Sequence, residues 1–292
     1  MGRSKDGMAR LALLGLPQDD NSTFLRGPRL APPLIRTALV SPSANMFAET
    51  GMDLGAEALW RDAGDLPLSR LTGQDAHDAI HDGVAAILAR GQAVISLGGD
   101  HSVSWPAVRA HAAQYPGLTI LHLDAHADLY DSMEDNPFSH ASPFARIMES
   151  GCVARLVQVG IRTLNDHQRA QVARFGVECH EMRHGIDMAN IRASLGIDGP
   201  VYLSIDLDVL DPAFAPGVSH HEPGGMSVRD VLHIIQNFGG QLIGGELVEL
   251  NPERDLNGVT AMVAAKILRE MMARCLADHA AEDGATVDGA GG

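Results

Sequence analysis

The sequence is poor in aromatic residues and cysteine, and it has no long apolar run. Phe, Trp and Tyr make up only 4% of the chain, so a core must be built from Ala, Val, Leu, Ile and Met. The three cysteines, Cys152, Cys179 and Cys275, lack metal-ligand spacing, which predicts reduced thiols in a cytoplasmic protein. No run reaches the ~18 apolar residues of a membrane span, and segment 1–10 is too polar for a secretory signal.

Basic residues are also scarce. There are 22 Lys and Arg against 37 Asp and Glu, and a net charge of −15 argues against nucleic-acid or membrane-surface binding. It suits attraction of a small cationic substrate. A chain of 292 residues with 45% hydrophobic residues suits one large α/β domain. We expect that domain at 1–280, followed by a disordered tail at 281–292.

Short apolar runs alternate with amphipathic segments along the chain. This alternation predicts a mostly parallel sheet with helices on both faces, a three-layer α/β/α fold. Segment 41–70 shows little periodicity. Strands are expected at 11–15, 93–97, 118–123, 155–159, 201–205 and 242–250, and helices at 31–40, 75–90, 107–114, 164–174, 187–195, 227–238 and 257–277.

Carboxylate and imidazole side chains follow three of the expected strands. In parallel sheets, ligands bind beyond the carboxyl ends of the strands, so these side chains should converge there. Buried carboxylates without counter-charges would repel each other, whereas divalent cations would make them ligands. The six candidate ligands are His101, Asp124, His126, Asp128, Asp206 and Asp208.

The donor chemistry indicates the kind of metal. Four carboxylates and two imidazoles without a thiolate favour Mn²⁺, while Fe²⁺, Co²⁺, Ni²⁺ and Zn²⁺ remain alternatives. Two such ions ~3.5–4 Å apart can bridge a water and lower its pKa. Each element alone has a structural explanation: Gly98-Gly99 as a turn, Asp211-Pro212 as a strand end, His126 as a hydrogen-bonding residue. Their joint occurrence favours metal, and His122 is assigned as a hydrogen-bonded neighbour of the site.

Three motifs resemble those of the ureohydrolase (arginase/agmatinase) superfamily: 98–102 (GGDHS), 124–128 (DAHAD) and 204–217 (SIDLDVLDPAFAPG). The resemblance extends from about Leu11 to about Leu276. Four further stretches are similar to plant-type arginases and their bacterial relatives: 21–27, 139–146, 215–225 and 260–266.

The resemblance implies an arginase-like α/β/α fold, a binuclear manganese centre and a homo-oligomer, either trimer or hexamer. It implies hydrolysis of a guanidino group to urea and an amine, by attack of a metal-bridging hydroxide. The six candidates would surround the ions, with Asp124 and Asp206 bridging them. The resemblance implies arginine as the preferred substrate, cleaved to ornithine and urea.

Residues on the substrate side also match the family. Glu249 resembles the glutamate that pairs with the guanidinium, a planar group that suits a carboxylate. Asp128 can carry a proton to the leaving amine, and His140 can shuttle protons or contact substrate. His220 and Glu222 are candidates for shaping the pocket. For His221, a solvated loop position is equally expected.

The chain departs from animal-type arginases where those recognise the rest of the substrate. Tyr130 and Asn165 stand where that type has asparagine and aspartate, and loop 131–138 shares little with it. Agmatine, guanidinobutyrate, small alkylguanidines and guanidine therefore remain alternatives, with Ni²⁺ suiting some of those relatives. The loop acids either attract a cationic tail or form a solvated rim; they are Asp131, Glu134 and Asp135.

Two alternatives belong to other classes. The chain can be a formiminoglutamase-type amidine hydrolase, which would release no urea. It can also be a non-catalytic oligomer partner. The presence of all six candidate ligands disfavours the second.

Overall fold

The computed structural model describes residues 9–56 and 58–288, and within them the chain forms one eight-stranded sheet. The strands are β1 (Leu11–Leu16), β2 (Trp60–Asp65), β3 (Ala93–Gly98), β4 (Thr119–Leu123), β5 (Arg155–Ile161), β6 (Glu178–Glu181), β7 (Pro200–Asp206) and β8 (Gln241–Val248). Their order is β2-β1-β3-β8-β7-β4-β5-β6, and every neighbouring pair is parallel.

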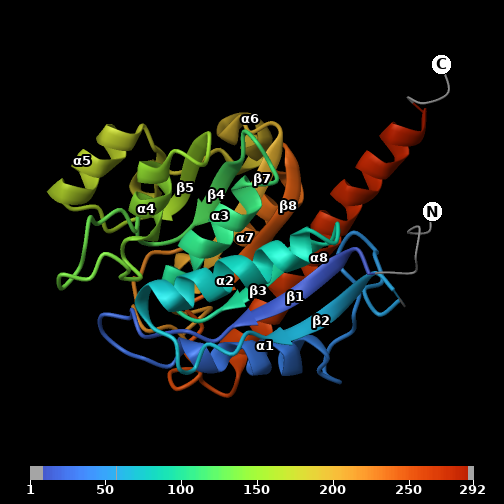
Figure 1. The fold of residues 1–292 in the computed structure, drawn as a ribbon, viewed down its shortest axis with the longest axis horizontal. Coiled ribbons are helices and arrows are strands. Elements are labelled where there is room, and N and C mark those ends of the chain that lie inside the picture. Colours follow the sequence, from blue (N-terminus) through green and yellow to red (C-terminus); the bar gives the residue numbers. More distant parts are fainter. Residues whose placement is uncertain (1–8, 57, 289–292) are drawn as a thin grey trace.

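Helices cover both faces of this sheet (Figure 1). They are α1 (Ala31–Leu39), α2 (Gly73–Leu88), α3 (Ser104–Ala112), α4 (Pro143–Ser150), α5 (Asp166–Phe175), α6 (Ile191–Leu195), α7 (Val228–Asn237) and α8 (Val259–Asp288). One core contains α1, α6, α7 and α8, and the cores on the opposite face contain α2 to α5. The expected three-layer α/β/α fold is confirmed.

The apolar runs form strands because both faces of the sheet are covered. All six residues of β1 are buried, and they alternate between the two cores: Leu11 and Leu13 face the α1/α8 side, Ala12 and Leu14 the α2/α3 side. Continuous apolar runs are what a sheet buried on two faces requires. The same alternation holds in β3, β4 and β7.

The elements that we did not predict are short or polar. The edge strands β2 and β6 contain no buried residue, so neither carries an apolar run. Helix α4 is only eight residues long. Helix α8 continues to Asp288, where we expected a disordered tail from 281. Segment 281–288 extends a long helix that is already formed, so it needs no nucleation of its own, and 289–292 lie outside the described residues. No helix of the described ranges has the length and apolar character of a membrane span.

The four central strands place the candidate residues together. β3, β8, β7 and β4 are neighbours, so their carboxyl ends lie side by side at one edge of the sheet. The chain approaches itself closely at this edge: a Cβ added to Gly99 would overlap the backbone of Gln18. The turn after β3 therefore requires glycine.

Candidate metal centre and substrate pocket

His101 lies in a ring of carboxylates just beyond β3. Its Nδ1 is 3.2 Å from Oδ2 of Asp124, 3.0 Å from Oδ2 of Asp128 and 3.3 Å from Oδ2 of Asp206. The nitrogen is buried, yet none of these contacts has hydrogen-bond geometry. Ligands about 2.1 Å from one ion are separated by about 3 Å from each other. Each of the three oxygens therefore lies at the distance from Nδ1 that separates two ligands of one metal ion.

His126 and Asp208 form a second group beside the first. Nδ1 of His126 is 2.9 Å from Oδ2 of Asp208 and 3.5 Å from Oδ1 of Asp124. Asp124 thus presents one oxygen to each histidine. The backbone N–H of Asp208 donates to Oδ1 of Asp206 (2.8 Å), which ties the remaining acids together. All six predicted ligands are brought into one cluster.

Supporting residues set the tautomer of His101. The Ser204 hydroxyl donates to Oε1 of Glu246 (2.8 Å), so it accepts from Nε2–H of His101 (3.0 Å). Tyr202 donates to the other Glu246 oxygen (2.8 Å). The Nδ1 lone pair of His101 is then directed into the carboxylate ring, as metal binding requires. We did not predict Ser204 or Glu246, although an acid inside the apolar β8 was a visible signal.

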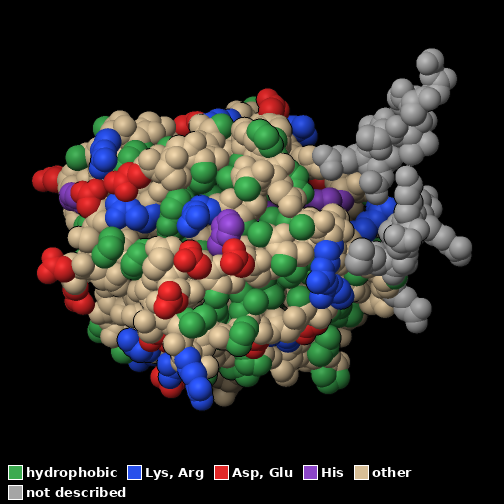
Figure 2. Space-filling model, in the orientation of Figure 1, with side chains coloured by type: hydrophobic (Ala, Val, Ile, Leu, Met, Phe, Trp, Pro, Cys, Tyr) green, Lys and Arg blue, Asp and Glu red, His purple; other side chains and the backbone are tan. Residues whose placement is uncertain are grey.

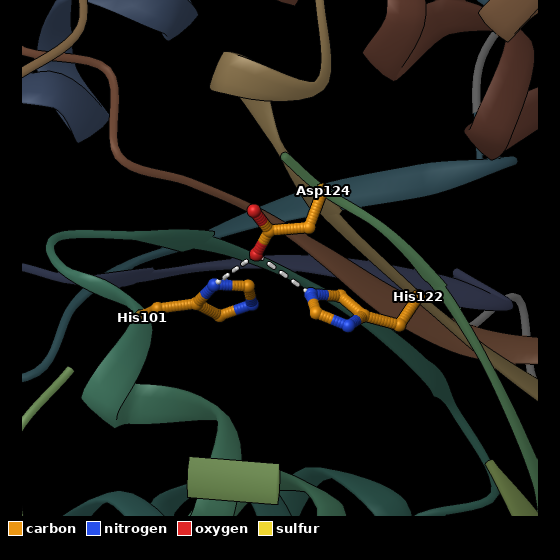
Figure 3. A group of neighbouring side chains, drawn as sticks. All are labelled: His101, His122 and Asp124. Atoms are coloured by element: carbon orange, nitrogen blue, oxygen red, sulfur yellow. Dashed lines mark hydrogen bonds and ion pairs between the residues drawn. The ribbon is translucent and has the colours of Figure 1, made fainter. Parts of the chain in front are cut away.

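His122 supports Asp124 from behind. Figure 3 shows His101 and His122 directed at the same Asp124 oxygen, with Nε2 of His122 at 2.8 Å. The Gln158 amide nitrogen donates to Nδ1 of His122 (3.0 Å) and to the carbonyl of Ala127 (2.7 Å). Nε2 therefore carries the ring proton and donates it to Asp124. This geometry agrees with the expectation that His122 is a bonded neighbour.

The electrostatics of the cluster favour cations. Burial and the charges of Asp208 and Asp124 raise the pKa of Asp206 well above its usual range, and burial also raises that of Asp208 to about 6. Burial disfavours charge on His101, but the surrounding carboxylates outweigh it and raise its pKa. Protons would otherwise have to neutralise these acids. Four carboxylates and two imidazoles therefore fit two divalent ions.

Glu249 follows β8 and is held by one of its two oxygens. Its Oε1 accepts from the backbone N–H of His101 (2.9 Å) and from Nδ1 of His140 (2.8 Å). Oε2 is buried without a partner. Burial disfavours charge on His140, but the Glu249 carboxylate outweighs it and raises the pKa of His140 to about 9. A bare carboxylate oxygen beside the cluster is an acceptor suited to a cation with N–H donors.

Two residues of the site have left-handed backbones. Asp128 has φ 51° and Glu249 has φ 65°. This conformation costs a residue other than glycine of the order of 1 kcal/mol or more, and such strained residues are enriched at active sites. The strain lies at a candidate ligand and at the candidate substrate acceptor.

The outer candidates lie around this centre. Asn165 donates to the Tyr130 hydroxyl (2.7 Å), and the ring centroid of His220 is 5.1 Å from that of His140. Glu222 is fixed through its backbone carbonyl, which accepts from Arg162. His221 is exposed and bonds the carbonyl of Pro216 (2.7 Å), as a solvated loop residue would.

Loop 131–138 carries its acids on the surface. Asp131 is exposed and accepts from Gln171 (2.9 Å) and Arg174 (3.3 Å). Glu134 and Asp135 are exposed in consecutive left-handed conformations, with φ 52° and 58°. The placement matches the solvated-rim alternative. On the face shown in Figure 2, acidic and basic side chains are interspersed.

Arg162 is a further residue that we did not predict. Its guanidinium donates to the carbonyls of Asp208 (2.7 Å) and Glu222 (3.0 Å), while its backbone N–H donates to the carbonyl of Ala125 (2.9 Å). It thereby joins both metal-binding turns to the loop around His220. A single arginine just after β5 carried no motif signal.

A parallel α/β/α sheet that gathers His and Asp side chains at its central strand ends suits a metal-dependent hydrolase. The Arginase family model matches residues 9–273. The chain is similar to the mitochondrial arginase 1 of Arabidopsis thaliana, at 47% identity over 91% of this chain and 81% of that protein. It is 32% identical to an agmatinase of Bacillus anthracis, over 90% of this chain and 91% of that one.

A solved structure agrees with these relatives. The arginase from Medicago truncatula superposes with a TM-score of 0.85 at 44% identity, covering 91% of this chain and 87% of that chain. The protein therefore belongs to the arginase family. The expected enzyme class, a ureohydrolase acting on a guanidino compound, is confirmed.

The expected cytoplasmic location is contradicted. The plant relatives from Arabidopsis, rice and Medicago are named as mitochondrial arginases. The reasoning from cysteine was insufficient because unpatterned thiols do not distinguish one reducing compartment from another.

Proposed function

We propose that the protein hydrolyses the guanidino group of arginine to ornithine and urea, with two Mn²⁺ ions. The observation that carries this is the free, buried Oε2 of Glu249 next to the His/Asp cluster. The similarity to plant arginases, at 45–47% identity, supports arginine. The residues that would hold the ions are His101, Asp124, His126, Asp128, Asp206 and Asp208.

The ions would supply a water activated as a nucleophile at neutral pH. Glu249 would accept N–H groups of the guanidinium at Oε2 and hold its carbon over the cluster. A cationic, resonance-stabilised group is a poor electrophile, so its orientation matters more than its affinity. Burial of Glu249 strengthens this pairing, because charges attract each other more strongly in a low-dielectric environment.

Proton transfer falls to two residues. Asp128 lies at the edge of the cluster, where its second oxygen can take a proton and return it to the departing amine. His140 is next to Glu249 and can protonate the amine product or exchange protons with solvent. The substrate tail would lie against Tyr130, Asn165, His220 and Glu222. We also propose that the enzyme is a homo-oligomer, a trimer or a hexamer.

The deciding experiment is a urea-release assay on the purified protein with arginine, agmatine, guanidinobutyrate and methylguanidine. Each substrate is tested with Mn²⁺ and with Ni²⁺. We expect the highest kcat/KM with arginine and Mn²⁺. A preference for agmatine would make the protein an agmatinase, a choice that the Bacillus anthracis relative keeps open. No urea from any substrate would refute the proposal.

A further inference from the structure

The Nε2 edge of the His140 ring contacts loop 21–23, which is distant from His140 in the sequence. The Thr23 hydroxyl is 2.9 Å from Nε2 of His140, and the backbone N–H of Thr23 points at the same nitrogen from 3.3 Å. The other ring nitrogen, Nδ1, bonds Glu249. His140 is thus held between Thr23 and the proposed guanidinium acceptor.

Loop 21–23 is itself firmly anchored. The backbone N–H of Asn21 donates to Asp100 (3.1 Å), and its side-chain amide donates to the Ser102 hydroxyl (3.0 Å). The Asn21 carbonyl accepts from the backbone N–H of His140 (3.1 Å). Asp100 and Ser102 belong to the turn that carries His101. These bonds therefore hold the Thr23 hydroxyl at a fixed distance from the turn that carries His101 and from the His140 ring.

A hydroxyl is suited to this position because it can donate or accept. It can donate to an unprotonated Nε2 and accept from a protonated one, whereas the backbone N–H can only donate. The carboxylate of Glu249 favours a charged ring, and the N–H of Thr23 favours a neutral one. Of these two Thr23 groups, only the hydroxyl can form a hydrogen bond with Nε2 in both the neutral and the protonated ring.

The orientation of the ring matters because it fixes Glu249. With Nδ1–H and the N–H of His101 on Oε1, the carboxylate cannot rotate, and Oε2 stays free. If the ring turned, Oε2 would gain competing partners or move. We infer that Thr23 is a positioning residue for guanidinium binding, acting through His140 and Glu249. This inference rests on the proposed function of Glu249.

The test compares Thr23→Val, Thr23→Ser and a matched control, Thr37→Val. Thr37 is exposed on α1 and loses one comparable bond, from its hydroxyl to the carbonyl of Pro33 (2.9 Å). For Thr23→Val, we expect KM for arginine to rise about 10-fold with kcat reduced less than 3-fold, which is about 1.4 kcal/mol of binding. Thr23→Ser should restore wild-type values, and Thr37→Val should have them.

A second readout does not depend on turnover. Calorimetry of the Mn²⁺-loaded proteins with methylguanidinium should show a Kd about 10-fold weaker for Thr23→Val alone, with bound manganese unchanged. Equal Kd and KM in Thr23→Val and Thr37→Val would overturn the inference, as would a loss of manganese in Thr23→Val. If no substrate releases urea, but Thr23→Val binds methylguanidinium about 10-fold more weakly than the wild type, the proposed function fails while the role of Thr23 stands.

Discussion

The metal side and the substrate side of the candidate site are built differently. The candidate ligands lie at or directly beyond the ends of three central strands, and five of the six are buried. The substrate side consists of loops, with Tyr130 half-buried and with Asn165 and the acids of 131–138 exposed. Strand ends can hold charged side chains at fixed distances, whereas loops tolerate change. The loops can therefore vary while the cluster at the strand ends keeps its geometry.

The largest effect is expected from a ligand on the strand side. Asp128→Asn keeps the size and suits the left-handed backbone, which Asn adopts readily, but it removes the charge. We expect kcat to fall at least ~10³-fold with a circular dichroism spectrum like that of the wild type. Asp131→Asn, an exposed acid in the next loop, is the control and should retain activity. Near-normal turnover in Asp128→Asn would remove Asp128 from the centre.

Glu249→Gln tests the position where the two sides meet. The neutral amide cannot offer the guanidinium a charged acceptor, so kcat/KM should fall about 10²–10³-fold, or about 3–4 kcal/mol. Bound metal should be unchanged, because Glu249 contacts the backbone of His101 rather than its ring. Glu253→Gln, on the exposed loop beyond, should behave as wild type. Equal kcat/KM in the two variants would exclude Glu249 as the acceptor.

The same division explains which parts were predictable. The central strands and all six candidate ligands follow from apolar runs and from acids placed after them. Edge strand β2 was missed because polar, half-exposed residues carry no such signal. Thr23 and Arg162 were missed because they act through contacts with residues over 40 positions away, which no local pattern encodes. Tyr130 and Asn165, which form a hydrogen bond with each other, were noticed in the sequence only because they differ from the residues of animal-type arginases.

Metal removal should destabilise the strand side specifically. Without cations, the buried carboxylates must take up protons or repel each other. Metal in 100-fold excess over its Kd adds about 2.7 kcal/mol to the unfolding free energy, so chelation should lower Tm by about 5–10 °C. Mn²⁺ should restore Tm more fully than Ca²⁺, which prefers more oxygen ligands. A Tm insensitive to chelator and to Mn²⁺ would contradict a metal centre.

His77 packs against Phe138 and so connects loop 131–138 to helix α2. It is buried on α2, both ring nitrogens lack partners, and its ring meets Phe138 edge-on at 4.7 Å. Burial lowers its pKa to about 4. Since the unfolded value is higher, near 6.5, stability is fully present above pH 6.5 and is lost as pH falls toward 4.

The corresponding variant is His77→Leu, which keeps the packing without the titration. When the pH is lowered from 7 to 4.5, the unfolding free energy of both proteins should fall. The fall should be about 2–3 kcal/mol smaller for His77→Leu than for the wild type. His111, whose pKa is also lowered to about 4, contributes equally to both proteins and cancels. His81→Leu, a half-exposed histidine on the same helix, is the control and should retain the wild-type pH dependence. Parallel pH curves for wild type and His77→Leu would show that His77 is not buried as described.

The smallest effect is expected from the loop pair itself. Tyr130→Phe removes the hydroxyl that accepts from Asn165, an exposed bond worth about 0.5–1.5 kcal/mol, so KM for arginine should rise about 2–10-fold with little change in kcat. Asn165→Ala removes this bond and also the cap that its side-chain oxygen provides to the backbone N–H of Gln168 (2.9 Å). Its effect on KM should therefore be at least as large, and the double variant should be no worse than Asn165→Ala. KM for agmatine should be measured as well. A comparison of the two KM values shows whether Tyr130 and Asn165 contact the end of the substrate at which arginine and agmatine differ. Additive effects in the double variant would mean that Tyr130 and Asn165 contact the substrate separately, and the loop side would then be a binding surface rather than a scaffold.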